Sequence, residues 1–126
     1  MKTVAARIVK KFMFVNRRAP HGTIYALEGL EVVLAASAFD QDVSLVFMED
    51  GVYQLVKDQD TQSVSLKNIA KTYRALADFD VRHLYVEVES LRERSLSAND
   101  LIVPVEIVEA ERLGELMEQQ DVILSF

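Results

Sequence analysis

The 126-residue sequence predicts an α/β fold of three layers (α/β/α), built on a mainly parallel sheet of five strands. Two observations and one general rule support this prediction. Short apolar runs alternate with longer segments of helical periodicity, which is typical of strand–helix–strand units. Some of the apolar runs are almost continuous, which suits strands of a parallel sheet that is covered on both faces. Right-handed crossovers between such strands place helices on both faces of the sheet.

The first strand–helix unit spans residues 10–39. Its strand covers residues 11–15 and must end before Pro20, which cannot donate a ladder hydrogen bond. A helix is expected to open at Thr23, whose hydroxyl can cap the free amides of the first turn. Apolar residues then recur at helical spacing, at Leu27, Leu30, Leu34 and Ala38. A functional site on such a fold is expected near turns of this kind, at the carboxyl ends of the strands.

The middle of the chain continues the alternation. Residues 43–48 predict a second buried strand, and residues 52–55 predict a short helical turn after it. A second long helix is predicted over residues 65–77, followed by a third strand over residues 81–88. The spacing of a capping box then predicts that a short helix begins at Ser90.

The last quarter of the chain predicts two more strands and one helix. Residues 101–105 form the predicted fourth strand, and Pro104 places it at an edge or makes it irregular, because proline lacks a ladder donor. Residues 121–126 predict a final short strand. The last helix is expected to place four apolar residues on one face: Ala110, Leu113, Leu116 and Met117.

Composition and charge narrow the class of protein. The length of 126 residues predicts one domain, and because half of the residues are apolar that domain is expected to be globular. Residues 1–6 are expected to form a flexible leader. The net charge of -6 argues against direct nucleic-acid binding, which needs clustered lysine and arginine. We recognise no membrane span and no signal peptide, so a cytoplasmic protein without membrane contact is expected.

The sequence contains no cysteine, which excludes disulfides, thiolate metal sites and covalent sulfur chemistry on this chain itself. His21 and His83 are too few for a zinc site without carboxylates, and no ligand spacing supports one. A serine-nucleophile elbow and the glycine-rich nucleotide motifs are missing as well. We therefore expect no cofactor, no metal and no catalytic residue.

The turn after the first strand is the first candidate for a binding site. Arg17, Arg18 and His21, together with the helix-terminal amides at Gly22 and Thr23, can hold a phosphate or a sulfur oxyanion. The alternative interpretation is that the two arginines are solvated loop charges and that His21 shapes the turn.

Tyr53 is the second candidate, because it follows the carboxyl end of the second strand and is expected beside the first turn. It is interpreted either as a ligand or partner contact or as a half-buried core tyrosine. His83, at the head of the third strand, is interpreted as a structural, hydrogen-bonded histidine.

Four short motifs, each placed after a predicted strand or at the end of the chain, resemble the DsrE/DsrF sulfur-relay family. They are Ala-Pro-His-Gly-Thr at 19–23, Asp-Gly-Val-Tyr-Gln-Leu at 50–55, Ser-Leu-Arg-Glu-Arg at 90–94 and Asp-Val-Ile-Leu-Ser-Phe at 121–126. Each motif alone is weakly specific, but their order between the expected elements is more so. The resemblance runs from Lys10 onward and is to the DsrF/TusC-type subunit.

The resemblance implies a flavodoxin-like α/β/α fold and a cytoplasmic heterohexamer of two copies each of three related subunits. Such complexes pass persulfide sulfur along a relay, in sulfur oxidation for the DsrEFH type and towards 2-thiouridine in tRNA for the TusBCD type. The implied partners are DsrE/TusD-type and DsrH/TusB-type subunits, with a downstream sulfur acceptor protein reached through the complex. Residues 11–42 look nearer to the DsrF side.

The chain departs from the family pattern at one place. The sulfur-carrying subunit of the family has its cysteine at the end of the third strand, which here is about residues 86–88, and none of these can form a persulfide. The expected function is therefore that of a non-catalytic partner subunit. The alternatives are a stand-alone module that binds a small anion or nucleotide near His21 and Tyr53, and a hydrolase-like enzyme, which lacks a nucleophile motif.

Overall fold

The computed structural model describes residues 9–18, 41–56, 83–101 and 104–125. The strands are β1 (Lys11–Asn16), β2 (Asp42–Phe47), β3 (His83–Glu87), β4 (Glu106–Val108) and β5 (Val122–Ser125). The helices are the 3-10 helices η2 (Glu49–Leu55) and η4 (Ala98–Asp100) and the α-helices α3 (Val88–Glu93) and α4 (Ala110–Glu118). The predicted leader and the predicted helices over 23–38 and 65–77 lie outside the described residues.

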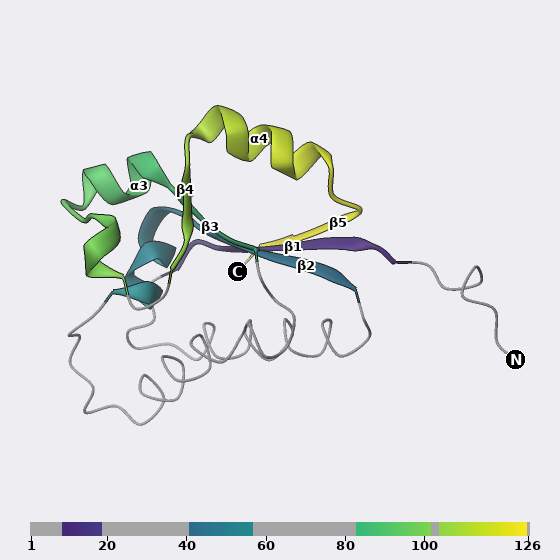
Figure 1. Cartoon of the computed structure of the whole chain (residues 1–126), viewed down its shortest axis with the longest axis horizontal. Coiled ribbons are helices and arrows are strands. Elements are labelled where there is room, and N and C mark those ends of the chain that lie inside the picture. The colour runs from purple at the N-terminus through teal and green to yellow at the C-terminus, as the bar shows by residue number, and fades with distance from the viewer. Residues whose placement is uncertain (1–8, 19–40, 57–82, 102–103, 126) are drawn as a thin grey trace, which may run out of the picture.

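The five strands form one sheet in the order β4-β3-β2-β1-β5, and every neighbouring pair is parallel (Figure 1). The predicted five-stranded parallel sheet is therefore confirmed. From β1, the strands β2, β3 and β4 follow one another towards one edge of the sheet. After β4 the chain returns through α4, and β5 pairs with the other side of β1. This order differs from the 2-1-3-4-5 of flavodoxin itself, although the class of fold is the same. It creates a topological switch point between β1 and β5.

Strands β1 and β2 and helix η2 lie close to where the sequence predicted them. Each of the two strands matches its prediction within one residue at either end. The predicted helical turn at 52–55 is the second half of η2, which begins earlier, at Glu49. In the register of the sheet, Val15 of β1 lies opposite Val46 of β2 and Ser125 of β5, so these three strands end at the same level.

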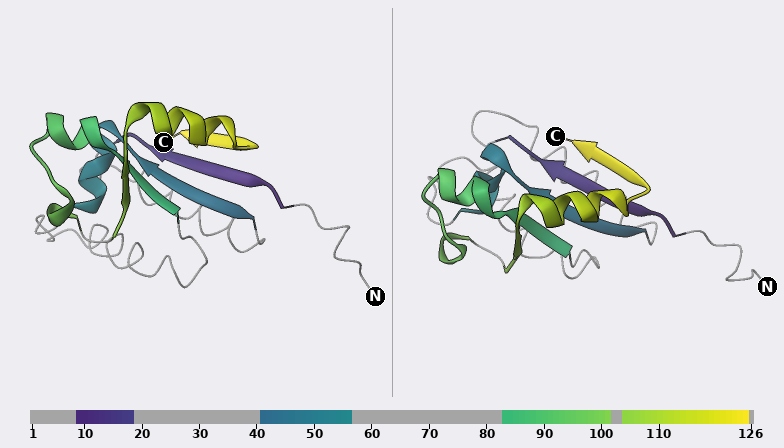
Figure 2. Two further views of the ribbon diagram at one scale, coloured as in Figure 1. Left: turned by 45° about the horizontal axis from the view of Figure 1, so that its top comes forward. Right: turned by 90° about the horizontal axis from the view of Figure 1, so that it is seen from above.

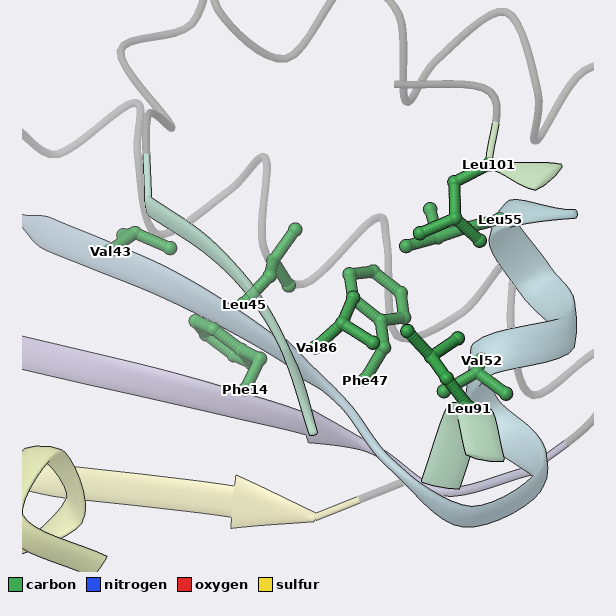
Figure 3. Close-up of a cluster of buried hydrophobic side chains, with 9 residues drawn as sticks. All are labelled: Phe14, Val43, Leu45, Phe47, Val52, Leu55, Val86, Leu91 and Leu101. Carbon is green, nitrogen blue, oxygen red and sulfur yellow. The ribbon is translucent and has the colours of Figure 1, made fainter. Parts of the chain in front are cut away.

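The described sheet buries apolar side chains on both faces, because alternate residues of a strand point to opposite sides. One cluster contains Phe14, Val43, Leu45, Phe47 and Val86 of the strands, with Val52, Leu55, Leu91 and Leu101 beyond their carboxyl ends (Figure 3). The other contains Met13, Val15, Val46 and Val108 under Leu113 and Leu116 of α4. Full burial of one such large side chain contributes about 1.5–3 kcal/mol.

Helix α4 lies over one face of the sheet between its two edges (Figure 2). Leu113 and Leu116 are buried and Met117 is half-buried, as the helical spacing predicted. Ala110, the fourth apolar residue predicted for this face, is exposed and does not share the burial of the other three. It follows the edge strand β4 almost directly and therefore lies at the corner of the sheet, where less surface is available to cover it.

The fourth strand is displaced from its predicted position. The sequence predicted residues 101–105, whereas β4 is Glu106–Val108. Leu101 forms only an isolated antiparallel bridge with Val56. Because Pro104 has no N–H to donate, the strand that pairs with β3 begins after it. The predicted edge position is correct, since β4 is the outermost strand on its side.

The predicted start of the helix after β3 is also wrong. Helix α3 begins at Val88, and Ser90 lies inside it instead of capping it. The helix ends in a Schellman arrangement, in which the Leu96 N–H donates to the Leu91 carbonyl at 2.9 Å and the Ser95 N–H to the Arg92 carbonyl at 3.1 Å. Ser95 accordingly has a left-handed backbone, with φ of 56°.

Candidate functional site

The carboxyl ends of β1 and β2 meet at one edge of the sheet and are held together by backbone contacts. The Met48 N–H donates to the Asn16 carbonyl at 3.1 Å, which extends the pairing past the end of β2. Gly51 of η2 lies directly against Asn16: a Cβ at position 51 would stand 1.8 Å from that carbonyl oxygen. Only glycine therefore fits at this position.

The side chain of Asn16 strengthens the same junction. It is 3 % exposed, and its Nδ2 donates to the carbonyl oxygens of Phe14 at 3.4 Å and Val46 at 3.3 Å. Gln54 of η2 is also buried, and its Nε2 donates to the Arg18 carbonyl at 2.8 Å. Helix η2 thus packs against the segment that follows β1 and fixes the backbone of Arg18.

Arg17 and Glu49 form an ion pair across the same junction. Arg17 Nε bonds to Glu49 Oε2, and Arg17 Nη2 donates to Glu49 Oε1 at 3.3 Å. The hydrogen bond from Arg17 is the main reason that the pKa of the Glu49 carboxyl lies below its ordinary value, and the Glu49 carboxylate raises the pKa of Arg17 in turn. Both side chains are about half exposed. Glu49 also has a left-handed backbone, with φ of 52°.

Ser90 connects the end of β3 to this junction. Its hydroxyl accepts the backbone N–H of Glu49 at 2.8 Å and donates to Glu87 Oε1 at 2.6 Å, and the residue is 2 % exposed. These bonds explain why Ser90 does not act as a helix cap. A buried serine whose proton is directed at a carboxylate holds the loop in place, and its position gives no access to a substrate.

Arg94 completes the connection between η2 and α3. Its Nε and Nη2 donate to Asp50 Oδ1 at 3.1 and 2.9 Å, and its Nη1 donates to the Ser90 carbonyl at 3.1 Å. The guanidinium carbon also lies 6.0 Å from the centre of the Tyr53 ring, within cation–π range. Tyr53 is half-buried in this position.

The structure places the predicted site residues in two groups. Arg17 and Arg18 line a pocket of about 330 Å³ with Glu49 and Ser125, whereas Tyr53 lies with Arg94. The other three predicted residues, His21, Gly22 and Thr23, lie outside the described residues. The roles of Glu49, Ser90, Arg94 and Ser125 were missed from the sequence. The motif at 90–94 was recognised, but no local pattern says which strand end each of its side chains reaches.

A second hollow, of about 260 Å³, lies beside β3 and β4 and is lined by His83, Leu84, Tyr85, Pro104, Val105 and Glu106. His83 is exposed, and its ring stacks on Tyr85 with the centroids 6.2 Å apart. Partial burial, with a smaller contribution from Glu106, raises the pKa of Tyr85 above its ordinary value. Nothing in this arrangement indicates a reaction.

The described segments offer two further negative findings. No three histidine, aspartate or glutamate side chains in them gather closely enough to hold a metal ion. None of the helices described has the length and apolarity needed to cross a membrane. Within these segments, the carboxyl ends of β1 and β2 combine a network of polar contacts with the pocket lined by Arg17 and Arg18.

Comparison with known proteins agrees with this fold. The model of the DsrE/DsrF-like family matches residues 10–126, and the chain belongs to that family. It is 46% identical, over 135 aligned positions, to the intracellular sulfur oxidation protein DsrF of Allochromatium vinosum, covering 96% of this chain and 99% of that protein. It is 36% identical over 118 positions to a TusC homolog of Vibrio vulnificus, covering 94% of this chain and 100% of the homolog.

Solved structures show the same architecture. The crystal structure of the ychN protein from E. coli superposes with a TM-score of 0.78 and 23% identity, covering 94% of this chain and 100% of the other. MTH1491 from Methanobacterium thermoautotrophicum, a protein of unknown function, has a TM-score of 0.66 at 16% identity and covers 91% of this chain and 98% of its own. At such identities the likeness establishes the fold alone, and it agrees with the predicted flavodoxin-like class.

Proposed function

We propose that this chain is a cysteine-free, non-catalytic subunit of a cytoplasmic complex that relays persulfide sulfur. The observation that carries the proposal is that a chain matching the DsrE/DsrF-like family over residues 10–126 has no cysteine anywhere in its sequence. A persulfide needs a thiolate to form on. In the proposed complex, sulfur is therefore carried by another subunit.

The carboxyl end of β3 supports this assignment. In the resemblance described above, the sulfur-carrying cysteine belongs at this place, where the present chain has Glu87 and Val88. The nearby hydroxyl of Ser90 is buried and bonded to Glu87 and to the backbone of Glu49. These hydrogen bonds connect the strand ends to one another, which supports a structural role for this region.

The proposed partners are a DsrE/TusD-type subunit, which supplies the cysteine, and a DsrH/TusB-type subunit, with a downstream acceptor protein reached through the complex. The edge strand β5 supports association with other subunits, because its residues Ile123 and Leu124 are 44% and 39% exposed. Apolar side chains exposed at a sheet edge are suited to burial in an assembly. The higher identity to the DsrF relative favours the sulfur-oxidation branch over tRNA thiolation.

The test is reconstitution with the two related subunits from the same cells. This chain carries the affinity tag, and the assembly is measured by size-exclusion chromatography with light scattering. A polysulfide donor is then added, and the intact mass of each subunit is determined. We expect a stable hetero-oligomer in which the cysteine-bearing partner gains one sulfur atom while the mass of this chain stays unchanged.

The controls separate assembly from sulfur transfer. Replacing the partner's cysteine by serine should abolish the gain in mass and leave the complex intact. Elution of this chain alone, in the presence of both partners, would contradict the proposal. That result would favour the alternative of a stand-alone module for small anions or nucleotides.

A further inference from the structure

The pocket of about 330 Å³ lies at the topological switch point of the sheet. Arg17 and Arg18 follow the end of β1, Ser125 is the last residue of β5, and Glu49 is the first residue of η2. Beyond β1 the chain continues towards β2 on one side, while β5 lies on the other side. Open α/β sheets bind their ligands in the crevice outside the strand ends at such a point. We propose that this pocket binds a small tetrahedral oxyanion of the sulfate, thiosulfate or phosphate class.

The chemistry of the described lining selects the ligand. The described lining consists of two arginines, one glutamate and one serine, so cationic residues outnumber acidic ones among these four, in a chain whose net charge is -6. A guanidinium offers several N–H donors in a planar fork that matches the oxygens of a tetrahedral anion. Ser125, whose side chain can donate a hydrogen bond, also lines the pocket. The cavity is at the small end of the range for ligand pockets, which suits an ion of this size.

The carboxylate of Glu49 competes with a bound oxyanion for Arg17. This carboxylate is paired with Arg17 in the present structure, and the Glu49 side chain is 47% exposed, so it can swing into solvent. The backbone of Glu49 does not have to move, because its N–H is held by the buried Ser90 hydroxyl. Binding of an oxyanion therefore exchanges one ion pair of Arg17 for another.

The backbone around the pocket is already in position. The Arg18 carbonyl is held by Gln54 at 2.8 Å, and the pairing of Val15 with Ser125 fixes the end of β5 beside that of β1. A ligand thus meets arginines that project from a fixed base, which reduces the entropy lost on binding.

The experiment is isothermal titration calorimetry on the isolated chain with sulfate, thiosulfate and phosphate at low ionic strength, where charge interactions are least screened. Arg17→Gln should weaken binding of the preferred anion about tenfold, because charge-assisted hydrogen bonds are lost. Glu49→Gln should strengthen it about fivefold by removing the competing ion pair. The order of affinity among the three anions distinguishes a sulfur oxyanion from a phosphate.

The matched control is Arg92→Gln. Arg92 is also an exposed arginine paired with a glutamate, Glu89, but it belongs to α3 and does not line the pocket. Its replacement should leave the affinity unchanged. Equal losses in the Arg17 and Arg92 variants would show diffuse attraction and overturn the proposal, as would unchanged affinity in Glu49→Gln or the absence of binding by all three anions. Because no partner is present, this result is independent of whether the relay complex forms.

Discussion

Strands β2 and β5 are both apolar in sequence, but they occupy opposite environments. Five of the six residues of β2 are buried, whereas no residue of β5 is. Strand β2 lies between β1 and β3 and has buried side chains on both faces of the sheet, whereas β5 is the edge strand that pairs with β1 (Figure 2). An apolar run in the sequence therefore identifies a strand but does not say whether that strand lies at the centre or at the edge of the sheet. The difference also leaves at β5 an apolar edge that an assembly can cover.

The largest expected effect is a loss of stability when a leucine of the buried strand β2 is replaced by alanine. The same replacement at a leucine of the edge strand β5 is the comparison. Leu45→Ala in β2 removes a side chain that is 1% exposed and should destabilise the fold by about 2–5 kcal/mol, through lost burial and the cavity left behind. Leu124 in β5 is already 39% exposed, so Leu124→Ala should lower the free energy of unfolding by less than about 1 kcal/mol. Urea unfolding followed by circular dichroism measures both. Equal losses in the isolated chain would mean that β5 is buried in solution.

The next largest effect on stability is expected at two glycines in helices. One of them is packed against a neighbouring strand, and the other faces open space. Gly51→Ala places a Cβ into the Asn16 carbonyl and should destabilise by about 3 kcal/mol. Gly114→Ala, in α4, meets nothing within 4 Å and should stabilise by about 0.5–1 kcal/mol, because alanine is the better helix former. The two changes in the midpoint of thermal unfolding should have opposite signs. A Gly51 variant as stable as the parent would show that the contact between η2 and β1 is looser than described.

A smaller gain is expected at the end of α3. Ser95 is exposed and has a left-handed backbone, which favours glycine. Ser95→Gly should raise the free energy of unfolding by about 0.5–1 kcal/mol. Ser97→Gly is the control, because Ser97 has an extended backbone and bonds to Asp100 in a capping box, so its replacement should destabilise. A loss of stability in the Ser95 variant would contradict the Schellman assignment.

The smallest effect concerns the exposed ion pair of Arg17 and Glu49. Arg17 holds the pKa of Glu49 below its ordinary value, so the pair stabilises the fold at neutral pH. That stabilisation disappears as the pH falls through the lowered pKa and the carboxylate takes up a proton. An NMR titration of the Glu49 carboxyl should give a pKa below that of an unperturbed glutamate, and Arg17→Met should raise it towards the ordinary value. An unchanged pKa in that variant would exclude the pairing.

The central strands and the helix α4 were predictable because each leaves a local signal. The runs at 11–15 and 43–48 are apolar enough to identify buried strands, and Leu113 and Leu116 recur at helical spacing. The resemblance to the DsrE/DsrF family also came from short local motifs. Two boundaries were wrong for a common reason. Which apolar residues near Pro104 pair with β3, and where Ser90 directs its hydroxyl, depend on neighbours from other parts of the chain.

The candidate site was predictable only in part. The sequence by itself determined that this chain cannot form a persulfide, that its sheet is parallel and that the turn after β1 carries two arginines, because composition and local periodicity suffice for these. Only the tertiary structure decided that Glu49 pairs with Arg17, that Ser90 joins η2 to β3 and that Ser125 reaches the arginine pocket. Those contacts join residues that lie 32 to 108 positions apart in the sequence. The strand order that brings them together is a property of the assembled sheet.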